Sequence, residues 1–444
     1  MKRAVVVGAG LAGLRAGWEL ARAGCEVVVL ERRSTPGGRA GSLRDAESGE
    51  TIDTGQHAFM GCYRAMKSWC KDLGTLPSLK FQKRLRVPYA LAEGKHREFR
   101  AMRLPAPLHL VVGAMAMRGL TAGEQLGLLR LARDILLPPR RKQDGFTVAG
   151  WEHVRRLPPA VRRFLIDPLA VAALNEVPAV ASAYPFLTVL HTLARSGNAG
   201  SAVGFASTGL ADLYVPPAVR AIEETGGSVR TGAWAVKLLV REDRAAGVEL
   251  ADGETVEGDA VVAAIPPWDL PPILGDHAPL AGLAKAAAEF TPSPIVTVHL
   301  WWDRSVHRAP FSGLPDGPFH WVFNRTVIVG PGKAGHEHLC LVKSGARDLL
   351  GRKPDDLAAL AAEDLRLRLP AARAARVVRS RTIWETKATV SLGPGTDARR
   401  PGAVTPLAGF VLAGDWTRTG LPATIEGAVI SGRNAAEAVL ASLQ

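Results

Sequence analysis

The chain has 444 residues, enough for two or three domains, and its 47% hydrophobic and 22% charged residues suit a globular protein that is soluble or surface-bound. Val177–Ala194 is the longest stretch without a charged residue, but Pro178 and Pro185 interrupt it, so we expect no membrane-spanning helix. The first predicted strand follows directly behind Lys2 and Arg3, so we expect no cleaved signal. Four cysteines without metal-ligand spacing argue against a disulfide scaffold and predict a reducing, cytoplasmic compartment.

Positive charge is concentrated in one segment. The net charge is +13, and residues 80–163 alone hold 18 Lys or Arg against 6 Asp or Glu. The rest of the chain is almost neutral. A local surplus of this kind predicts an anionic partner for this segment.

A nucleotide-binding pattern opens the chain. Val5–Val7 is typical of a buried parallel strand, and Gly8, Gly10 and Gly13 follow it in the spacing Gly-x-Gly-x-x-Gly ahead of an apolar-periodic helix. In this pattern the first glycine makes the turn, the second admits a pyrophosphate to the backbone, and the third lets helix and strand pack closely. The first N–H groups of the helix would then point at the phosphates.

Three further segments extend this site. A second strand, Glu26–Leu30, ends at Glu31, the distance at which an acidic side chain accepts a ribose hydroxyl. The glycines of residues 36–41 allow backbone contact with a cofactor, and Arg39 can reach a phosphate or a flavin carbonyl. A polar, glycine-containing loop follows at 53–57. The pattern therefore predicts a dinucleotide cofactor.

Residues 80–205 interrupt this pattern and predict part of a substrate domain. Short strands are expected within 81–102, an apolar and basic stretch runs over 104–137, and further helices continue to about Leu193. The basic residues here include Arg118, Arg130, Arg133, Arg140, Arg141 and Lys142. Three interpretations stay open: a monotopic membrane surface, which we place slightly ahead, a buried helix pair with a solvated basic face, and a nucleic-acid site. The last is disfavoured because aromatic residues are not interleaved with the charges.

The chain then returns to the nucleotide-domain pattern and leaves it once more. The expected elements are a helix over 211–225, strands over 235–240 and 247–250 before an Asp-Gly turn, and a buried strand over 259–265. Alternation over 295–302 predicts a strand of a second, antiparallel sheet, with partners at 320–324 and 339–343 and a helix over 354–369. His336 and His338 make a poor metal site by themselves, and we expect them in a solvated loop and strand start.

The C-terminal segment completes the pattern. Phe410–Asp415 predicts a strand, followed by a polar loop and a helix from Ala423 to about Leu440. Gly414 and Asp415 stand where a ribityl or pyrophosphate oxygen can be held. The N-terminus of a helix carries partial positive charge, so it would stabilise the anionic pyrimidine ring of a reduced flavin.

These motifs, in this order, resemble the FAD-dependent amine oxidase and phytoene desaturase superfamily over essentially the whole chain. The matching segments are Gly8-x-Gly10-x-x-Gly13, Glu31, Gly37-Gly38-Arg39, the strands within 229–240, Gly414-Asp415 and Glu426-Gly427-Ala428. Within the superfamily, residues 53–57, 384–389 and 414–428 resemble the bacterial hydroxysqualene dehydroxylases. The third segment is shared with plant-type phytoene desaturases, and in the second the family more often has Arg where this chain has Lys387.

The resemblance implies an α/β fold in which a Rossmann-like FAD-binding domain is interleaved with an α+β substrate domain built of a mixed antiparallel sheet and helices. The FAD-binding domain is expected in 1–79, 206–275 and 405–444, and the substrate domain in 80–205 and 276–404. No cysteine follows Cys340, so FAD is expected to be non-covalent. The residues expected to bind it are Gly8, Gly10, Leu11, Ala12, Gly13, Glu31, Gly38, Arg39, Gly55, Gln56, Val236, Gly414, Asp415, Thr424 and Ile425.

The implied reaction removes the hydroxyl of hydroxysqualene and delivers a hydride from reduced FAD, which gives squalene. The protein must then bind a long apolar chain, polarise or protonate the leaving hydroxyl, and keep water from a cation-like centre. The candidate acids are His57, Glu385 and Lys387. The alternative, favoured for each residue taken singly, is that His57 hydrogen-bonds the cofactor or its loop and that Glu385 and Lys387 pair with each other. No metal site is expected, and the electron donor stays unidentified.

A hydrocarbon of this length has to enter from a bilayer, so we expect peripheral contact with an anionic membrane, at the inner face of the cell membrane, and no nucleic-acid partner. Three other functions stay open. A phytoene or carotenoid desaturase has the same fold and the opposite redox direction. An amine oxidase would call for an aromatic cage, and the chain has only 4 tyrosines. A non-enzymatic FAD-binding module would lack a closed apolar tunnel.

Overall fold

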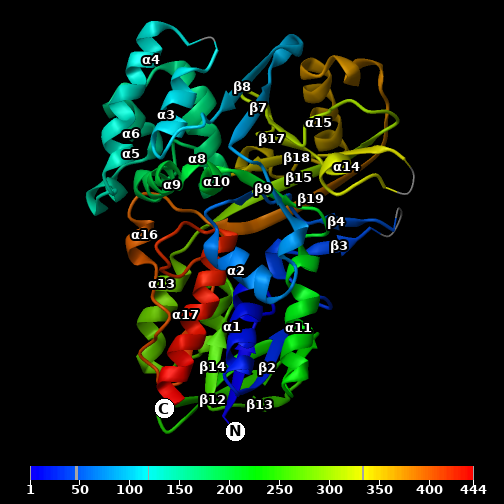
Figure 1. Ribbon diagram of the computed structural model, residues 1–444. Helices are drawn as coiled ribbons and strands as arrows, with labels where there is room; N and C mark the ends of the chain where they lie inside the picture. The colour runs from blue at the N-terminus through cyan, green and yellow to red at the C-terminus, as the bar shows by residue number, and fades with distance from the viewer. Residues whose placement is uncertain (1, 46–48, 119, 333–334, 444) are drawn as a thin grey trace.

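The computed structural model describes residues 2–45, 49–118, 120–332 and 335–443. Figure 1 shows two parts stacked along the long axis of the molecule. A parallel sheet with its helices forms the end that holds both termini, and a larger mixed sheet forms the other part, between a lobe of helices and α15 (Pro354–Arg368). In these residues no helix combines the length and apolarity needed to cross a membrane.

The parallel sheet has five strands in the order β10-β2-β1-β14-β20. They are β10 (Ser228–Thr231), β2 (Glu26–Glu31), β1 (Arg3–Val7), β14 (Ala260–Ala263) and β20 (Phe410–Leu412). Successive side chains of a strand point to opposite faces of a sheet. Ala4 and Val6 therefore pack on the helices α1 (Leu11–Arg22), α11 (Val215–Glu224) and α17 (Ile425–Leu443).

The opposite face of this sheet is covered by a three-stranded antiparallel sheet. Its strands are β11 (Ala235–Arg241), β12 (Arg244–Leu250) and β13 (Thr255–Glu257). Val5 and Val7 share a core with Leu238 and Val248 from this small sheet. The continuous apolar run of the first strand is thus explained by burial on both faces, as in other α/β folds.

The second large sheet has seven strands in the order β19-β15-β18-β17-β16-β7-β8. They are β19 (Val377–Val390), β15 (Pro292–Trp302), β18 (Glu337–Ser344), β17 (Trp321–Asn324), β16 (Phe311–Gly313), β7 (Arg86–Ala90) and β8 (His96–Arg100). The expected strands over 295–302, 339–343 and 320–324 are confirmed as β15, β18 and β17 of one sheet, in which β18 pairs with β15 and β17 pairs with β18 rather than directly with β15. The 14-residue strand β19 was not predicted, because it is a half-exposed edge strand whose apolar residues are interrupted by charged ones such as Arg379, Arg381 and Lys387.

Both large sheets draw their strands from ranges that the sequence assigned to the two domains. The parallel sheet uses strands within 3–31, 228–263 and 410–412, and the seven-stranded sheet uses strands within 86–100 and 292–390. The mixed α/β class is confirmed by this arrangement. The domain boundaries themselves stay predictions.

The helical lobe consists of short helices at the end of the molecule away from the termini (Figure 1). They include α3 (Leu108–Met115), α4 (Ala122–Leu128), α5 (Ala132–Leu136), α6 (Val148–Arg155), α8 (Asp167–Leu174) and α9 (Ala183–Arg195). Its outer surface carries large apolar side chains that are between 37% and 65% exposed, namely Leu104, Leu108, Leu126, Leu129, Leu136, Leu137, Phe146 and Val154. We call these eight residues the exposed apolar group.

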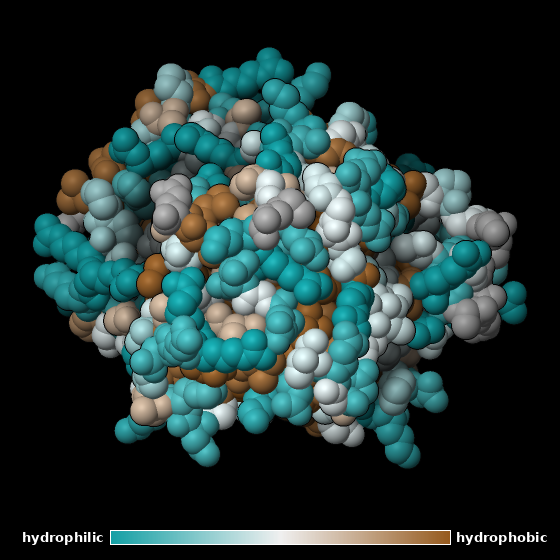
Figure 2. Space-filling view, turned by 90° about the horizontal axis from the view of Figure 1, so that it is seen from below, coloured by the Kyte–Doolittle hydropathy of each residue, from teal (hydrophilic) through white to brown (hydrophobic). Residues whose placement is uncertain are grey.

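Basic side chains accompany the exposed apolar group. Arg118, Arg130, Arg140, Arg141 and Lys142 are exposed, whereas the side chain of Arg133 lies outside the described part of the structure. Figure 2 views the molecule from below, the end opposite to the lobe. Hydrophilic residues cover most of that face, with hydrophobic residues in small groups among them.

Candidate cofactor and substrate site

A single elongated cavity of about 650 Å³ connects the parallel sheet with the helical lobe. Its lining includes all but one of the residues expected to bind the cofactor, namely Gly8, Gly10, Leu11, Ala12, Glu31, Gly38, Arg39, Gly55, Gln56, Val236, Gly414, Asp415, Thr424 and Ile425. His57 also lines it, whereas Gly13, Glu385 and Lys387 do not. The sequence motifs, distant along the chain, therefore meet around one cavity.

The glycine-rich turn shows why these positions exclude side chains. Gly8 has φ +103°, and a Cβ atom there would lie 2.7 Å from the carbonyl oxygen of Ala264. A Cβ on Gly13 would lie 1.8 Å from the carbonyl oxygen of Gly8, so Gly13 serves the close packing of α1 rather than the lining. We call the end of the cavity lined by Gly8, Gly10, Glu31 and Val236 the nucleotide end. Because α1 begins at Leu11, which also lines the cavity, its first N–H groups face this end.

Two residues at the nucleotide end have geometry that suits a nucleoside. The carboxylate of Glu31 accepts hydrogen bonds from the backbone N–H of Ala9 (3.0 Å) and Arg33 (2.9 Å), which fixes it at the cavity and leaves lone pairs for ribose hydroxyls. Val236 lies at a register shift between Ala235 and Lys237 of β11. A bulged residue is left unpaired by the strand ladder, so its backbone is available to the edge of a planar base.

A buried ion pair holds the loop at 53–57. Asp53 accepts hydrogen bonds from the Ser42 hydroxyl (2.7 Å) and the Leu210 N–H (2.9 Å), and it forms an ion pair with Arg325 of α14 (Arg325–Ile328). Arg325 also donates to the side-chain oxygen of Gln56 at 2.8 Å. Sequence reasoning missed Arg325, because nothing local marks a residue whose partners lie about 270 positions away.

His57 is neutral, with a defined tautomer. Its Nδ1 lies 2.8 Å from the carbonyl oxygen of Gly55, and a carbonyl only accepts, so Nδ1 carries the proton. Burial lowers the pKa of His57 below its usual value, which keeps the ring neutral. Nε2 of the neutral ring then has a lone pair that can accept a hydrogen bond from a ligand hydroxyl.

The other two candidate acids lie beside the cavity rather than in it. Lys387 is exposed, and its Nζ lies 5.7 Å from the centre of the Trp268 ring, which itself lines the cavity. Glu385 sits on β19, in register with Ile295 of β15. Their sequence motif does reach the cavity, through Ala388 and Thr389.

Arg39 joins the two parts of the molecule at the cavity. Its guanidinium donates to Asp415 (2.6 Å) and to the backbone carbonyl of Ala388 (2.7 Å). Gly414, with φ +135°, donates its N–H to the Ser431 hydroxyl at 2.9 Å, which ties the strand end to α17. Glu426, from the predicted C-terminal motif, does not line the cavity and instead accepts from the first N–H groups of α2 (Arg64–Asp72).

The rest of the cavity, which we call the apolar end, is lined by aliphatic and aromatic side chains. They include Leu85, Val87, Phe99, Leu110, Val111, Leu128, Leu131, Ile135, Phe164, Ile166, Leu190, Phe311 and Phe323. Within the described part of the chain, the acidic lining residues are Glu31, Asp269 and Asp415. Arg32 pairs with Asp269 and Arg39 pairs with Asp415, so no carboxylate is left to hold a cation in the apolar end.

His338 is a correction to the sequence analysis. It lies at the start of a strand, β18, as expected, but it is buried rather than solvated. Its ring stacks on Trp301 with ring centres 4.2 Å apart, and its Nε2 lies 2.9 Å from Nδ1 of His299. Across the described residues, no group of three or more potential metal-binding side chains occurs.

Comparisons with known proteins match the chain along its length. The family model for flavin containing amine oxidoreductases matches residues 11–440. A hydroxysqualene dehydroxylase of Rhodopseudomonas palustris is 30% identical over 98% of both chains, and a 15-cis-phytoene desaturase of Synechococcus elongatus is 26% identical over 99% of this chain and 96% of that one. An oxidoreductase from Methanosarcina mazei has a similar fold, with a TM-score of 0.76 at 17% identity over 98% of this chain and all of the other. The extent of the family match means that the chain belongs to the flavin containing amine oxidoreductases and is a flavin-dependent oxidoreductase.

Proposed function

We propose that this protein binds FAD non-covalently and converts hydroxysqualene to squalene. The observation that carries the proposal is the two-ended cavity, with glycine turns and Glu31 at one end and a long apolar lining at the other. The 30% identity with a hydroxysqualene dehydroxylase over 98% of both chains supports the choice of substrate. A polyprenoid alcohol matches a site whose apolar end is lined mainly by aliphatic and aromatic side chains, with a few polar residues such as His57 and Asn175 in the rest of the lining.

The residues at the nucleotide end fit FAD. Glu31 would hold the ribose, the start of α1 the pyrophosphate, and Val236 the edge of the adenine. No cysteine occurs among the lining residues of the described chain, which supports non-covalent binding. When bound and reduced, the flavin supplies a hydride.

The protein's own contribution is orientation and exclusion of water. In the overall reaction a C–O bond would break, a C–H bond would form with the hydride, and the oxygen would leave as water with the proton that is the second hydrogen of the doubly reduced flavin, FADH2, which is thereby oxidised to FAD. The lone pair on Nε2 of His57 would accept a hydrogen bond from the substrate hydroxyl and so fix its direction. The apolar lining would keep solvent from the developing cation.

Two other functions use the same fold. A phytoene desaturase would oxidise a hydrocarbon rather than reduce an alcohol, and the 26% identity with such an enzyme supports this alternative. An amine oxidase would have to hold a cationic substrate. Of the acidic lining residues of the described chain, Asp269 and Asp415 are paired with arginines, and Glu31 lies at the glycine-rich turn, where it accepts backbone N–H groups. No unpaired carboxylate therefore lies in the apolar end, which disfavours an amine substrate.

The decisive experiment is anaerobic. Protein reduced with dithionite is mixed with hydroxysqualene, and we expect flavin reoxidation together with squalene appearing in equal amount by chromatography. Parallel reactions with oxidised protein and phytoene test the desaturase alternative. Reoxidation with no squalene, or dehydrogenated phytoene in the parallel reaction, would refute the proposed reaction.

His57→Phe should lower kcat/KM for hydroxysqualene about fivefold, because one hydrogen bond to an orienting acceptor contributes about 1 kcal/mol. FAD should stay bound, since the contacts of Arg325 with Asp53 and Gln56 remain and the variant loses only the bond from the imidazole to the Gly55 carbonyl. Steady-state squalene formation measures the effect. Lys387→Met is the control and should leave the rate unchanged, since Lys387 is exposed outside the cavity. Equal rates in His57→Phe and wild type would remove His57 from the reaction.

We further propose that the helical lobe docks peripherally on the anionic, cytoplasmic face of the cell membrane. Leu126 and Leu136 of the exposed apolar group lie on α4 and α5, the same short helices whose inner residues Leu128 and Ile135 line the cavity. The exposed basic side chains around it complement anionic headgroups. If the lobe docks on the membrane, a lipid substrate could move from the bilayer into the apolar end of the cavity without passing through water.

Sedimentation with phosphatidylglycerol vesicles at low salt tests the docking. Arg140→Glu/Lys142→Glu should weaken binding by more than tenfold, because each basic residue near the surface contributes about 1 kcal/mol. Leu126→Ser/Leu129→Ser should weaken it as well, since these side chains are 65% and 52% exposed. The control is Arg241→Glu/Arg244→Glu at the opposite end, which should bind as wild type. If both lobe variants sediment with the vesicles as well as wild type does, the helical lobe is not the membrane-binding surface.

A further inference from the structure

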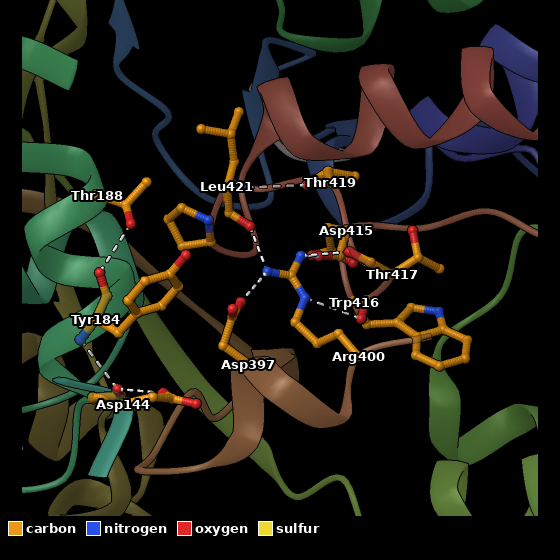
Figure 3. Close-up of polar contacts among 12 residues, drawn as sticks. Asp144, Tyr184, Thr188, Asp397, Arg400, Asp415, Trp416, Thr417, Thr419 and Leu421 are labelled. Carbon is orange, nitrogen blue, oxygen red and sulfur yellow. Dashed lines mark hydrogen bonds and ion pairs between the residues drawn. The ribbon is translucent and has the colours of Figure 1, made fainter. Parts of the chain in front are cut away.

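Arg400 follows α16 (Thr396–Arg399), and its side chain is fully buried. All five of its N–H groups have acceptors (Figure 3). Nε donates to the Trp416 carbonyl (3.2 Å), Nη2 to the carbonyls of Asp415 (2.8 Å) and Thr417 (2.6 Å), and Nη1 to the Leu421 carbonyl and to Asp397 (2.9 Å). Four of its five acceptors are therefore backbone carbonyls of one segment.

That segment, residues 415–421, connects β20 to α17, and we call it the connecting loop. It begins at Asp415, which lines the cavity, and ends just before Thr424 and Ile425, which do so as well. On the cavity side Arg39 holds the Asp415 carboxylate, and on the far side Arg400 holds its carbonyl. Two other contacts anchor the loop to its surroundings: Arg418 N–H donates to the Pro401 carbonyl (2.7 Å) and the Trp416 indole N–H donates to the Ile265 carbonyl (2.9 Å). Arg400 is distinct because it alone gathers four carbonyls of the loop on one side chain.

Asp397 connects this arrangement to the helical lobe. One carboxylate oxygen accepts from Arg400, and the other accepts from Arg141 at 2.5 Å. Arg141 is half-exposed and lies over the Tyr184 ring, with its guanidinium carbon 4.6 Å from the ring centre. The buried charge of Arg400 is thus compensated by a carboxylate that itself rests against the lobe.

We propose that Arg400 is a positioning residue for the cofactor: by gathering the carbonyls of the connecting loop, it holds Asp415 and the start of α17 in the arrangement that FAD needs. A flexible loop would have to be ordered each time FAD binds, and that cost would appear as lost affinity. The inference rests on FAD as the cofactor of the proposed function, but not on the substrate or the reaction.

The test compares two buried arginines. Arg368 is also buried and also donates to backbone carbonyls, those of Ala90 (2.8 Å) and Pro315 (3.1 Å), while pairing with Asp364. It lies in the part with the seven-stranded sheet and does not line the cavity. Arg368→Met should therefore lower the unfolding temperature without changing affinity for FAD.

Arg400→Met and Arg400→Lys are prepared as holoproteins beside Arg368→Met and wild type. Release of FAD on dilution is followed by its fluorescence, and the visible absorption band reports the environment of the ring. We expect the dissociation constant for FAD to rise more than tenfold in Arg400→Met and by a smaller factor in Arg400→Lys. The visible absorption band of the flavin should be broader in Arg400→Met than in wild type. Affinity within twofold of wild type in both, or an equal loss in Arg368→Met, would overturn the inference. Should Arg400→Met fail to fold, Arg400→Lys decides alone. Wild type that binds no FAD would instead refute the proposed function.

Discussion

Arg325→Met is expected to lower the free energy of unfolding by about 3–5 kcal/mol, because it leaves the Asp53 carboxylate buried without its cation. The side chains of Arg325 and Asp53 are only 4% and 3% exposed, so water cannot replace the lost partner. Urea denaturation followed by tryptophan fluorescence measures the change. The loss should be accompanied by weaker FAD binding, since Gln56 loses the donor that holds it at the cavity.

Two further variants separate this ion pair from a general effect of removing arginine. Arg241→Met breaks a pair with Glu257 in which both side chains are more than half exposed, and it should cost well under about 1 kcal/mol. Arg325→Met/Asp53→Asn removes both charges and should recover part of the loss. If Arg325→Met were no more destabilising than Arg241→Met, the ion pair would not be what holds the loop.

Acid should unfold the protein well before its carboxylates titrate. Burial lowers the pKa of His299 to about 3 and those of His307 and His320 to about 4. Below pH 6.5 these histidines bind protons in the unfolded chain but stay neutral in the folded protein. Their contribution to the free energy of unfolding is therefore fully present above pH 6.5 and is lost as the pH falls toward 4. Each such histidine contributes about 1.4 kcal/mol per pH unit in this window.

One buried acid acts in the opposite direction. Burial and the neighbouring Asp167 raise the pKa of Glu152 to about 8, so its contribution to stability decreases as the pH rises from 4.5 to 8. The net expectation is a loss of about 2–3 kcal/mol per pH unit between pH 6 and 4.5, measured as urea midpoints at fixed ionic strength. His320→Asn should reduce that net slope by about half, because it removes one of the three histidines that one acid partly offsets. A stability that stays constant down to pH 5 would contradict the assignment of these histidines as neutral.

What the sequence could predict follows from how local each signal is. The turn at Gly8, Gly10 and Gly13, with Glu31 behind the next strand, is specified within one short stretch, and all but Gly13 line the cavity. The strand at 295–302 was predicted correctly because residues of two kinds alternate along its whole length, which is a local sequence pattern. Periodicity is a property of neighbours in the chain, and these elements needed nothing else.

The missed features depend on partners distant in sequence. Arg325 and Arg400 acquire their roles only where the fold brings Asp53 or the connecting loop against them. His338 is polar by type, and burial beside His299 and Trp301 is decided by the pairing of β15 with β18. The positions of Glu385 and Lys387 outside the lining likewise follow from which way β19 turns its side chains.

The thinness of the lobe over the apolar end has a consequence for turnover. In α4 and the residues that follow it, Leu128 and Leu131 face inward and Leu126 and Leu129 face outward, so a single layer of helix separates the interior from the surroundings. A hydrocarbon passing through needs only two short helices to move apart, not a channel along the molecule. If the proposed function holds, release of the squalene product through these helices into the lipid would be the rate-limiting step. A detergent that dissolves squalene should then raise kcat.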